Sequence, residues 1–188
     1  MSIGQETIRS APPGADERRR SYRALAAELD ELLSAELDEV AAMATFAAVV
    51  HHSLRQASWT GFYRRVAPDL LRVGPYQGPL GCLEIELSRG VCGAAARERR
   101  TQVVADVEAF PGHIACDPAS RSELVVPVFD LAGNVVAVLD LDSHQPSAFD
   151  ELDAVELESL VAKLAPFFGT GTPREGPREG LREGRREG

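Results

Sequence analysis

The chain has 188 residues and a hydrophobic fraction of 44%, which is enough for one globular domain with a real core. Its formal net charge of −9 excludes nucleic acid and anionic membranes as primary partners. There is no secretory signal and no apolar run of about 18 residues, so we expect a cytoplasmic protein without a membrane partner. In that compartment cysteines tend to be catalytic, redox-active or metal-binding.

The two ends of the chain are polar and are not expected to contribute to the core. Residues 1–15 are predicted to be a flexible lead. Residues 169–188 carry a near-repeat of the form xREG, in which a glycine at every fourth position disfavours a helix, so we expect a solvated tail. The domain is therefore predicted to span residues 16–168.

Hydrophobic periodicity predicts the elements of this domain. Apolar residues at helical spacing indicate two helices, within 22–33 and 36–54, and an alanine-rich helix follows Gly90. Short strands are predicted at 59–66, 69–76, 82–87, 101–107, 122–130 and 134–143. The last two flank a short turn and should form an antiparallel hairpin. Ser147 and Asp150 are interpreted as a capping box that begins a closing helix. The pattern favours an α+β fold in which an antiparallel sheet of about six strands is packed between N-terminal helices and a C-terminal helix.

The three cysteines are predicted at the edges of elements. Cys82 begins a strand, Cys92 lies in the first turn of a helix, and Cys116 lies in the loop that opens "PGHIACDPASRSELVVP". The partial positive charge of a helix N-terminus favours a thiolate, so on that argument alone Cys92 is the most acidic thiol. Cys116 has His113 as a positive neighbour and Asp117 as an opposing one. Local physics therefore leaves open which thiol attacks, and each cysteine could also be a small buried residue.

A zinc site is a further alternative that the spacing disfavours. Three cysteines and His113 could supply four ligands, but the chain has no CxxC pair. We therefore expect neither a metal nor a cofactor.

Acidic and aromatic residues form a second candidate constellation. Asp140 and Asp142 are two apart on a predicted strand, so both carboxylates project from one face and could bind an amine or hold a proton. The alternative is a pair of solvated carboxylates at the end of the strand. Glu123, on the neighbouring hairpin strand, could face the same pocket. Trp59 and Tyr63 are four apart on one strand and share a face; core packing is their default role, and an aromatic box for a small ligand is the sharper one.

Five blocks of this sequence, taken in order, resemble the free methionine-(R)-sulfoxide reductases, which are GAF domains. The blocks are "WTGFYRR", "VGPYQG", "CLEIELSRGVCG", "VVADVEAFPGHIACDPASRSELVVPV" and "VAVLDLDS". The resemblance covers about residues 20–168. It implies free methionine-(R)-sulfoxide as substrate, thioredoxin as reductant and a homodimer. The rival interpretations are a non-catalytic sensory GAF module for a small metabolite and a thiol redox switch without turnover.

The same resemblance implies roles for individual residues. Cys116 matches the attacking cysteine, which becomes a sulfenic acid, and Cys82 matches the resolving cysteine that forms a disulfide with it. Cys92 matches the remaining thiol, a relay or alternative partner. The substrate would be held by the following groups: Glu123, Asp140 and Asp142 at its ammonium and sulfoxide oxygen, Trp59 and Tyr63 around its methyl group, and the backbone N–H groups near Ile114 and Ala115 at its carboxylate.

Overall fold

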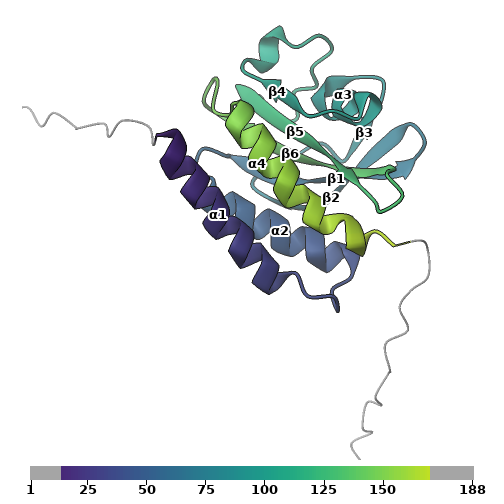
Figure 1. Cartoon of the computed structure of the whole chain (residues 1–188). Helices are drawn as coiled ribbons and strands as arrows, with labels where there is room; N and C mark the ends of the chain where they lie inside the picture. The colour runs from purple at the N-terminus through teal and green to yellow at the C-terminus, as the bar shows by residue number, and fades with distance from the viewer. Residues whose placement is uncertain (1–13, 170–188) are drawn as a thin grey trace, which may run out of the picture.

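The computed structural model describes residues 14–169 (Figure 1). Most of the predicted lead (residues 1–15) and of the predicted tail (residues 169–188) lies outside the described residues. The elements in chain order are α1 (Ala15–Leu32), α2 (Glu39–Ser53), β1 (Trp59–Ala67), β2 (Leu70–Gln77), β3 (Glu84–Glu86), α3 (Gly90–Glu98), β4 (Gln102–Val104), η1 (Val107–Ala109), β5 (Ser122–Phe129), β6 (Val135–Ser143), α4 (Glu151–Val161) and η2 (Ala162–Phe167).

The strands form one six-stranded sheet in the order β3-β2-β1-β6-β5-β4, and every neighbouring pair is antiparallel. β5 and β6 form the predicted hairpin, whose turn is closed by Asp130, because its side chain accepts hydrogen bonds from the backbone and the side-chain amide of Asn134. The α+β class and the six strands are thereby confirmed.

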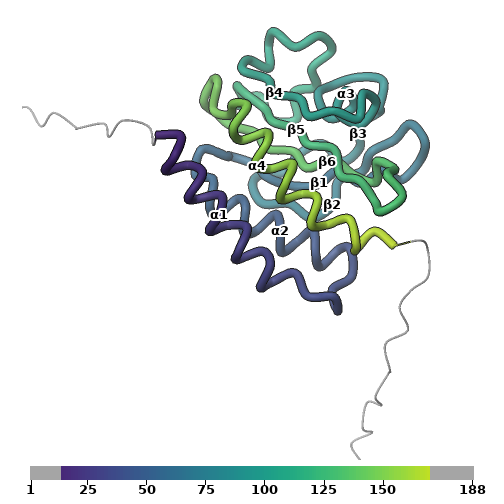
Figure 2. Tube along the Cα trace, in the orientation of Figure 1, coloured from purple at the N-terminus to yellow at the C-terminus, as the bar shows by residue number. Residues whose placement is uncertain are grey.

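Three helices cover one face of this sheet. Side chains of α1, α2, α4 and η2 share a single apolar core with the strands, in which Phe46 of α2 meets Phe62 of β1 edge to face at 5.7 Å. Leu157 of α4 belongs to this same core. In Figure 2 α1 and α4 run side by side. The expected placement of the sheet between the N-terminal helices and the C-terminal helix is therefore wrong: both sets lie on one face, because their apolar stripes bury against the same strand side chains.

The start of α4 also differs from the prediction. The N-cap is Asp150, whose carboxylate accepts from the backbone N–H of Leu152 and of Asp153, and the Asp153 side chain accepts from the Asp150 N–H. Ser147 lies in the preceding turn with a φ of +52° and takes no part in the cap. The capping box thus begins three residues later than the sequence suggested.

The opposite face of the sheet is covered by α3 and by two long loops (Figure 1). A second apolar cluster forms there, and it includes Trp59, Tyr63, Val125 and Val138 from the strands and Cys92 from α3. Among the helices of residues 14–169, none combines the length and the apolar character that a bilayer crossing requires. All three cysteines and all the predicted acidic residues lie on this second face.

Candidate active site

The strand register brings the predicted acidic and aromatic residues onto one face of the sheet. On β6, Asp142 pairs with Glu123 of β5 on one side and with Trp59 of β1 on the other. Asp140 lies two residues before Asp142 on β6, and Tyr63 lies four residues after Trp59 on β1. Because side chains alternate along a strand, Asp140 and Tyr63 point to the same face of the sheet as Asp142 and Trp59. Directly opposed residues of antiparallel strands lie close together, which makes these side chains one contiguous surface.

Two loops close over that surface and are joined by a disulfide. We refer to residues 78–83, between β2 and β3, as the Cys82 loop, and to residues 110–121, between η1 and β5, as the Cys116 loop. A disulfide joins Cys82 to Cys116, with their Cα atoms 5.1 Å apart across 34 residues of sequence. The structure thus brings together two of the three cysteines singled out in the sequence and leaves Cys92 as the free thiol.

Two glycines anchor the Cys116 loop to the start of α3. Gly90 has a φ of +71° and its N–H donates to the carbonyl of Gly112. The positive φ favours glycine here, and a Cβ at Gly90 would also come 3.0 Å from the end of the Ile114 side chain, which would have to move slightly. Ile114 lines the cavity, whereas Ala115 is exposed and does not. Within residues 14–169, the N–H groups of Ile114 and Ala115 have no hydrogen-bond partner.

Cys92 is buried, and its environment opposes ionisation. Its side chain is 3% exposed, and its Sγ donates to Oε1 of Glu123 at 3.8 Å. Burial raises the pKa of Cys92 well above its usual range, and the nearby carboxyl groups of Asp140 and Glu123 raise this pKa further. The expectation that the helix N-terminus makes Cys92 an acidic thiol is wrong, because a helix-terminus effect of about 0.3–1 kcal/mol is smaller than the cost of desolvating a thiolate.

The acidic residues form a cluster whose pKa values are raised by burial. Glu123 and Asp140 are 6% and 5% exposed, and burial raises the pKa of each well above its usual range, with a neighbouring carboxyl group adding to the effect. Burial also raises the pKa of half-buried Asp142 to about 6. Oδ1 of Asp140 is buried without a hydrogen-bond partner in the described part of the chain. Such a cluster retains protons near neutral pH and can donate one to a bound substrate.

His113 and Asp117, the charged neighbours expected for Cys116, contact other residues instead. Nε2 of His113 lies 3.9 Å from Oε2 of Glu123, and burial lowers the pKa of His113, so the ring stays neutral. Asp117 accepts from the N–H of Ala119 and pairs with His144 at 3.0 Å. These contacts lower the pKa of Asp117 and fix its side chain within the loop.

The two predicted aromatic residues lie next to the cavity but do not line it. The rings of Trp59 and Tyr63 stack with centroids 5.6 Å apart, and Trp59 stacks on Tyr76 at 5.2 Å. The Trp59 indole donates to the carbonyl of Pro79 in the Cys82 loop. The disulfide fixes the Cys82 loop against the sheet, and in this structure the loop therefore covers both the Trp59 and the Tyr63 rings.

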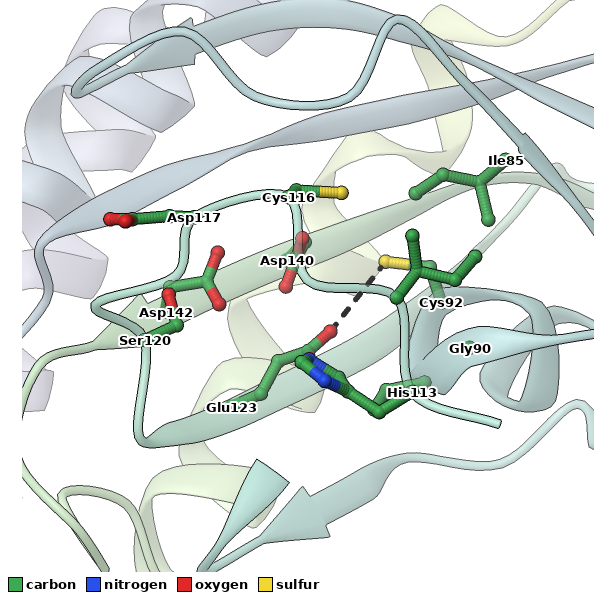
Figure 3. Close-up of a pocket in the computed structure, with 12 residues that line it drawn as sticks. Ile85, Gly90, Cys92, His113, Cys116, Asp117, Ser120, Glu123, Asp140 and Asp142 are labelled. Carbon is green, nitrogen blue, oxygen red and sulfur yellow. Dashed lines mark hydrogen bonds and ion pairs between the residues drawn. The ribbon is translucent and has the colours of Figure 1, made fainter. Parts of the chain in front are cut away.

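The cavity itself lies between the Cys116 loop, the start of α3 and the sheet (Figure 3). Its volume is about 20 Å³, which is room for about one water molecule. It is lined by Ile85, Gly90, Val91, Cys92, His113, Ile114, Cys116, Asp117, Ser120, Glu123, Asp140 and Asp142. Sequence reasoning missed Ser120, whose buried Oγ has no partner among the described residues. A loop serine carries no periodic signal that could have revealed it.

The arrangement combines a reversible thiol pair with protonated carboxyl groups. Cys116 and the three acidic residues line one cavity, so a sulfur atom and a proton source face the same small space. Such a site can couple transfer of an oxygen atom to sulfur with delivery of protons.

Comparison with known proteins agrees with this fold and site. The sequence model of the GAF domain family matches residues 26–167. A free methionine-R-sulfoxide reductase of Escherichia coli is 37% identical over 149 residues, which cover 79% of this chain and 89% of the relative. The structure of a free methionine-R-sulfoxide reductase from Neisseria meningitidis in complex with its substrate matches with a TM-score of 0.73 at 41% identity, over 84% of this chain and 92% of that chain.

A third similarity is to a protein described as a GAF sensor, from Burkholderia vietnamiensis. Its structure matches with a TM-score of 0.75 at 44% identity, over 79% of this chain and 93% of that chain. The chain belongs to the GAF-domain family and, within it, to the free methionine-R-sulfoxide reductases, a class of thiol-dependent oxidoreductases.

Proposed function

We propose that this protein reduces free L-methionine-(R)-sulfoxide to L-methionine in the cytoplasm and is recycled by thioredoxin. One observation carries the proposal: the Cys82–Cys116 disulfide forms above a cavity whose floor holds Glu123, Asp140 and Asp142. A sulfoxide reductase needs a thiol to accept oxygen, a second thiol to resolve the product and an acid to protonate the sulfoxide.

The chemical steps assign different parts to the two bonded cysteines. A carboxyl group of the cavity protonates the sulfoxide oxygen, and the Cys116 thiolate attacks the sulfoxide sulfur, so that a bond forms between the two sulfur atoms. The hydroxyl group then moves from the substrate sulfur to the Cys116 sulfur as the substrate's S–O bond breaks. The bond between the two sulfurs breaks as well, which releases methionine and leaves Cys116 as a sulfenic acid. The thiol of Cys82 then displaces the sulfenic oxygen as water and forms the disulfide. A thioredoxin dithiol reduces this bond, and two electrons pass from thioredoxin to the substrate in each cycle.

The substrate would be held by groups that the fold places around the cavity. Its ammonium would meet the carboxyl groups of Glu123, Asp140 and Asp142, one of which would protonate the sulfoxide oxygen. Its carboxylate would accept from the free N–H groups of Ile114 and Ala115. A cavity of about 20 Å³ is too small for methionine sulfoxide, so the loops must separate on reduction and uncover Trp59 and Tyr63 for the substrate's methyl group.

A substrate comparison tests the proposed specificity. The reduced protein should act on the free (R) epimer and not on the free (S) epimer, with methionine release measured by chromatography. A peptide that contains methionine sulfoxide should not react, because groups that bind both the ammonium and the carboxylate leave no room for peptide bonds. Equal rates on the peptide would refute the proposal. A sensory GAF module, which is the rival interpretation, would bind a ligand but release no methionine.

A single-turnover experiment tests the two cysteine roles. Without external thiol, the reduced wild type should release about one equivalent of methionine and end as the disulfide. Cys116→Ser should release none, whereas Cys82→Ser should release about one equivalent and leave a sulfenic acid that dimedone labels at Cys116. The matched control is Cys92→Ser, which should keep both the turnover and the disulfide. Loss of turnover in Cys92→Ser together with retention in Cys116→Ser would reverse the assignment.

A further inference from the structure

The free thiol Cys92 belongs to a compact group of potential metal ligands. One ligand atom each from Cys92, Glu123 and Asp140 lies within 4.8 Å of the other two, and all three residues are buried. They come from α3, β5 and β6 and point toward one another (Figure 3). The proposed reaction consumes the other two cysteines and leaves this thiol without a necessary part.

A fourth donor lies beside this group, and one of its members has an unpaired acceptor. Nε2 of His113, from the Cys116 loop, lies 3.9 Å from Oε2 of Glu123. Asp140 is 5% exposed and lines the cavity, and its Oδ1 has no hydrogen-bond partner in residues 14–169. A buried carboxylate oxygen without a partner is costly unless something else coordinates it. The cavity in front of these atoms has the volume of about one water molecule, which also suits one metal ion.

We propose that Cys92, His113, Glu123 and Asp140 bind a Zn²⁺ ion. A thiolate, an imidazole and two carboxylates are the borderline donor set that zinc accepts, whereas Mg²⁺ and Ca²⁺ prefer oxygen ligands alone. Zinc ligands at about 2.0–2.3 Å in a tetrahedron lie roughly 3.3–3.8 Å from one another. The Sγ–Oε1 separation of 3.8 Å already has that spacing, and Nε2 of His113 lies 3.9 Å from the other oxygen of the same carboxylate, so a small movement of the His113 ring would bring it into the set.

This site differs from the zinc site that the sequence disfavoured. That alternative used all three cysteines, but in the disulfide form the sulfurs of Cys82 and Cys116 are bonded to each other. The new site uses Cys92 alone and adds two carboxylates from neighbouring strands, so it exists while the disulfide is intact. Its occupation would block the carboxyl groups of the proposed reductase. Zinc binding itself does not rest on the proposed function, since it can be measured in oxidised protein that does not turn over.

The test uses the oxidised full-length protein without any reductant. Equilibrium dialysis against Zn²⁺, followed by atomic absorption, should find about one zinc ion per chain, and excess Mg²⁺ should not displace it. With Cd²⁺ in place of Zn²⁺, an ultraviolet thiolate-to-metal charge-transfer band should appear. In the oxidised protein this band reports on Cys92, because it is the only free thiol among the three cysteines.

Variants identify the ligands. Cys92→Ser should abolish the cadmium band, and Cys92→Ser, Asp140→Asn and His113→Ala should each weaken zinc binding at least about tenfold. Glu108→Gln is the matched control, because this carboxylate is exposed on η1 and should leave the affinity unchanged. If Cys92→Ser does not fold, the cadmium band of the wild type and the zinc affinity of His113→Ala, a change on a loop, still test the proposal. Absence of zinc binding, or zinc binding without the cadmium band in the wild type, would overturn the proposal.

Discussion

The two faces of the sheet both bury apolar side chains, but they differ in how they treat buried polar groups. Under α1 and α4, the buried carboxylate of Asp153 is fully engaged: it accepts from the hydroxyl of Tyr22 and from the N–H of Asp150, and it pairs with Arg18 at 2.8 Å. Under α3, Asp140 has a buried oxygen without a partner in the described chain, and burial raises the pKa of its neighbours Glu123 and Cys92 well above their usual ranges.

This difference separates the face that forms the main apolar core from the face that holds the candidate site. A satisfied buried carboxylate contributes to specificity of packing, whereas an unsatisfied one costs free energy and is retained where a ligand completes it. Among the described residues, the carboxyl groups whose pKa burial raises all lie on the α3 face, and such a cluster is a mark of a functional site. We therefore expect a change at a buried polar group to lower mainly stability on the helical face and mainly activity on the α3 face.

The largest effect is expected on activity, when the buried aspartate of each face, Asp140 or Asp153, is replaced by asparagine. Asp140→Asn should lower kcat/KM for methionine-(R)-sulfoxide about 100- to 10,000-fold, because it removes a carboxyl group that can protonate the sulfoxide. Asp153→Asn is the matched change on the other face. It should leave kcat/KM unchanged but lower the free energy of unfolding by about 1–3 kcal/mol. Steady-state kinetics and denaturant titration of both variants measure the contrast, and equal losses of activity would remove the distinction between the faces.

The next largest effect concerns the apolar core of the helical face. Phe46 is fully buried against Phe62, so Phe46→Ala should lower the free energy of unfolding by about 3–5 kcal/mol while the folded fraction keeps its kcat. Val40 lies on the same helix but is 47% exposed, and Val40→Ala should cost less than about 1 kcal/mol. Urea unfolding gives both values. A large loss of kcat in folded Phe46→Ala would show that this core also positions the site.

Local patterns in the sequence were sufficient to predict the sheet side of the site. The alternation through Asp140 and Asp142 fixes which face they share, and a hairpin with a short turn must place Glu123 beside them. These relations depend on neighbours in the chain, so periodicity captures them. The disulfide between Cys82 and Cys116 was expected from the family resemblance alone, because no local pattern links residues 34 apart.

What the sequence did not reveal depends on long-range packing. The face of the sheet that α4 covers depends on the strand side chains against which its apolar residues bury, and the periodicity of α4 alone does not specify them. The pKa of Cys92 follows from burial by elements distant in sequence, which outweighs its position at a helix N-terminus. The exposure of Trp59 depends on a loop held by the disulfide. Burial is a property of the folded chain, and composition constrains it only weakly.

A smaller effect should distinguish the two faces by how the free energy of unfolding depends on pH. Burial raises the pKa of Asp142 to about 6, from an ordinary value of 3.8, so the folded state binds this proton more tightly than the unfolded chain. Stability should then fall by about 2–3 kcal/mol as pH rises from about 4 to about 6. The hydrogen bond from Arg18 lowers the pKa of Asp150 to about 2, so its contribution is present above about pH 4 and is lost as pH falls toward 2.

Two variants assign these opposite slopes. Asp142→Asn should flatten the decline between about pH 4 and pH 6, and Asp150→Asn should leave that decline in place. Because Asp150 is largely exposed, its ion pair should contribute less than about 1 kcal/mol. Urea unfolding at several pH values measures both. A decline that persists in Asp142→Asn would assign it to Glu123 or Asp140 instead.

The smallest expected effect concerns reduction of the disulfide by a partner protein. Leu80 and Leu83 flank Cys82 and are 73% and 64% exposed, so they offer apolar contact area to a dithiol protein that approaches the bond. Leu80→Ser should raise KM for thioredoxin about 3- to 10-fold, equivalent to about 1 kcal/mol of lost contact, and should leave turnover with a small dithiol unchanged. Leu131 is the matched control: it is 76% exposed in the turn between β5 and β6, far in sequence from both cysteines, and Leu131→Ser should change neither value. If Leu80→Ser slows the small dithiol equally, the leucine acts on the conformation of the Cys82 loop and not on recognition of the partner.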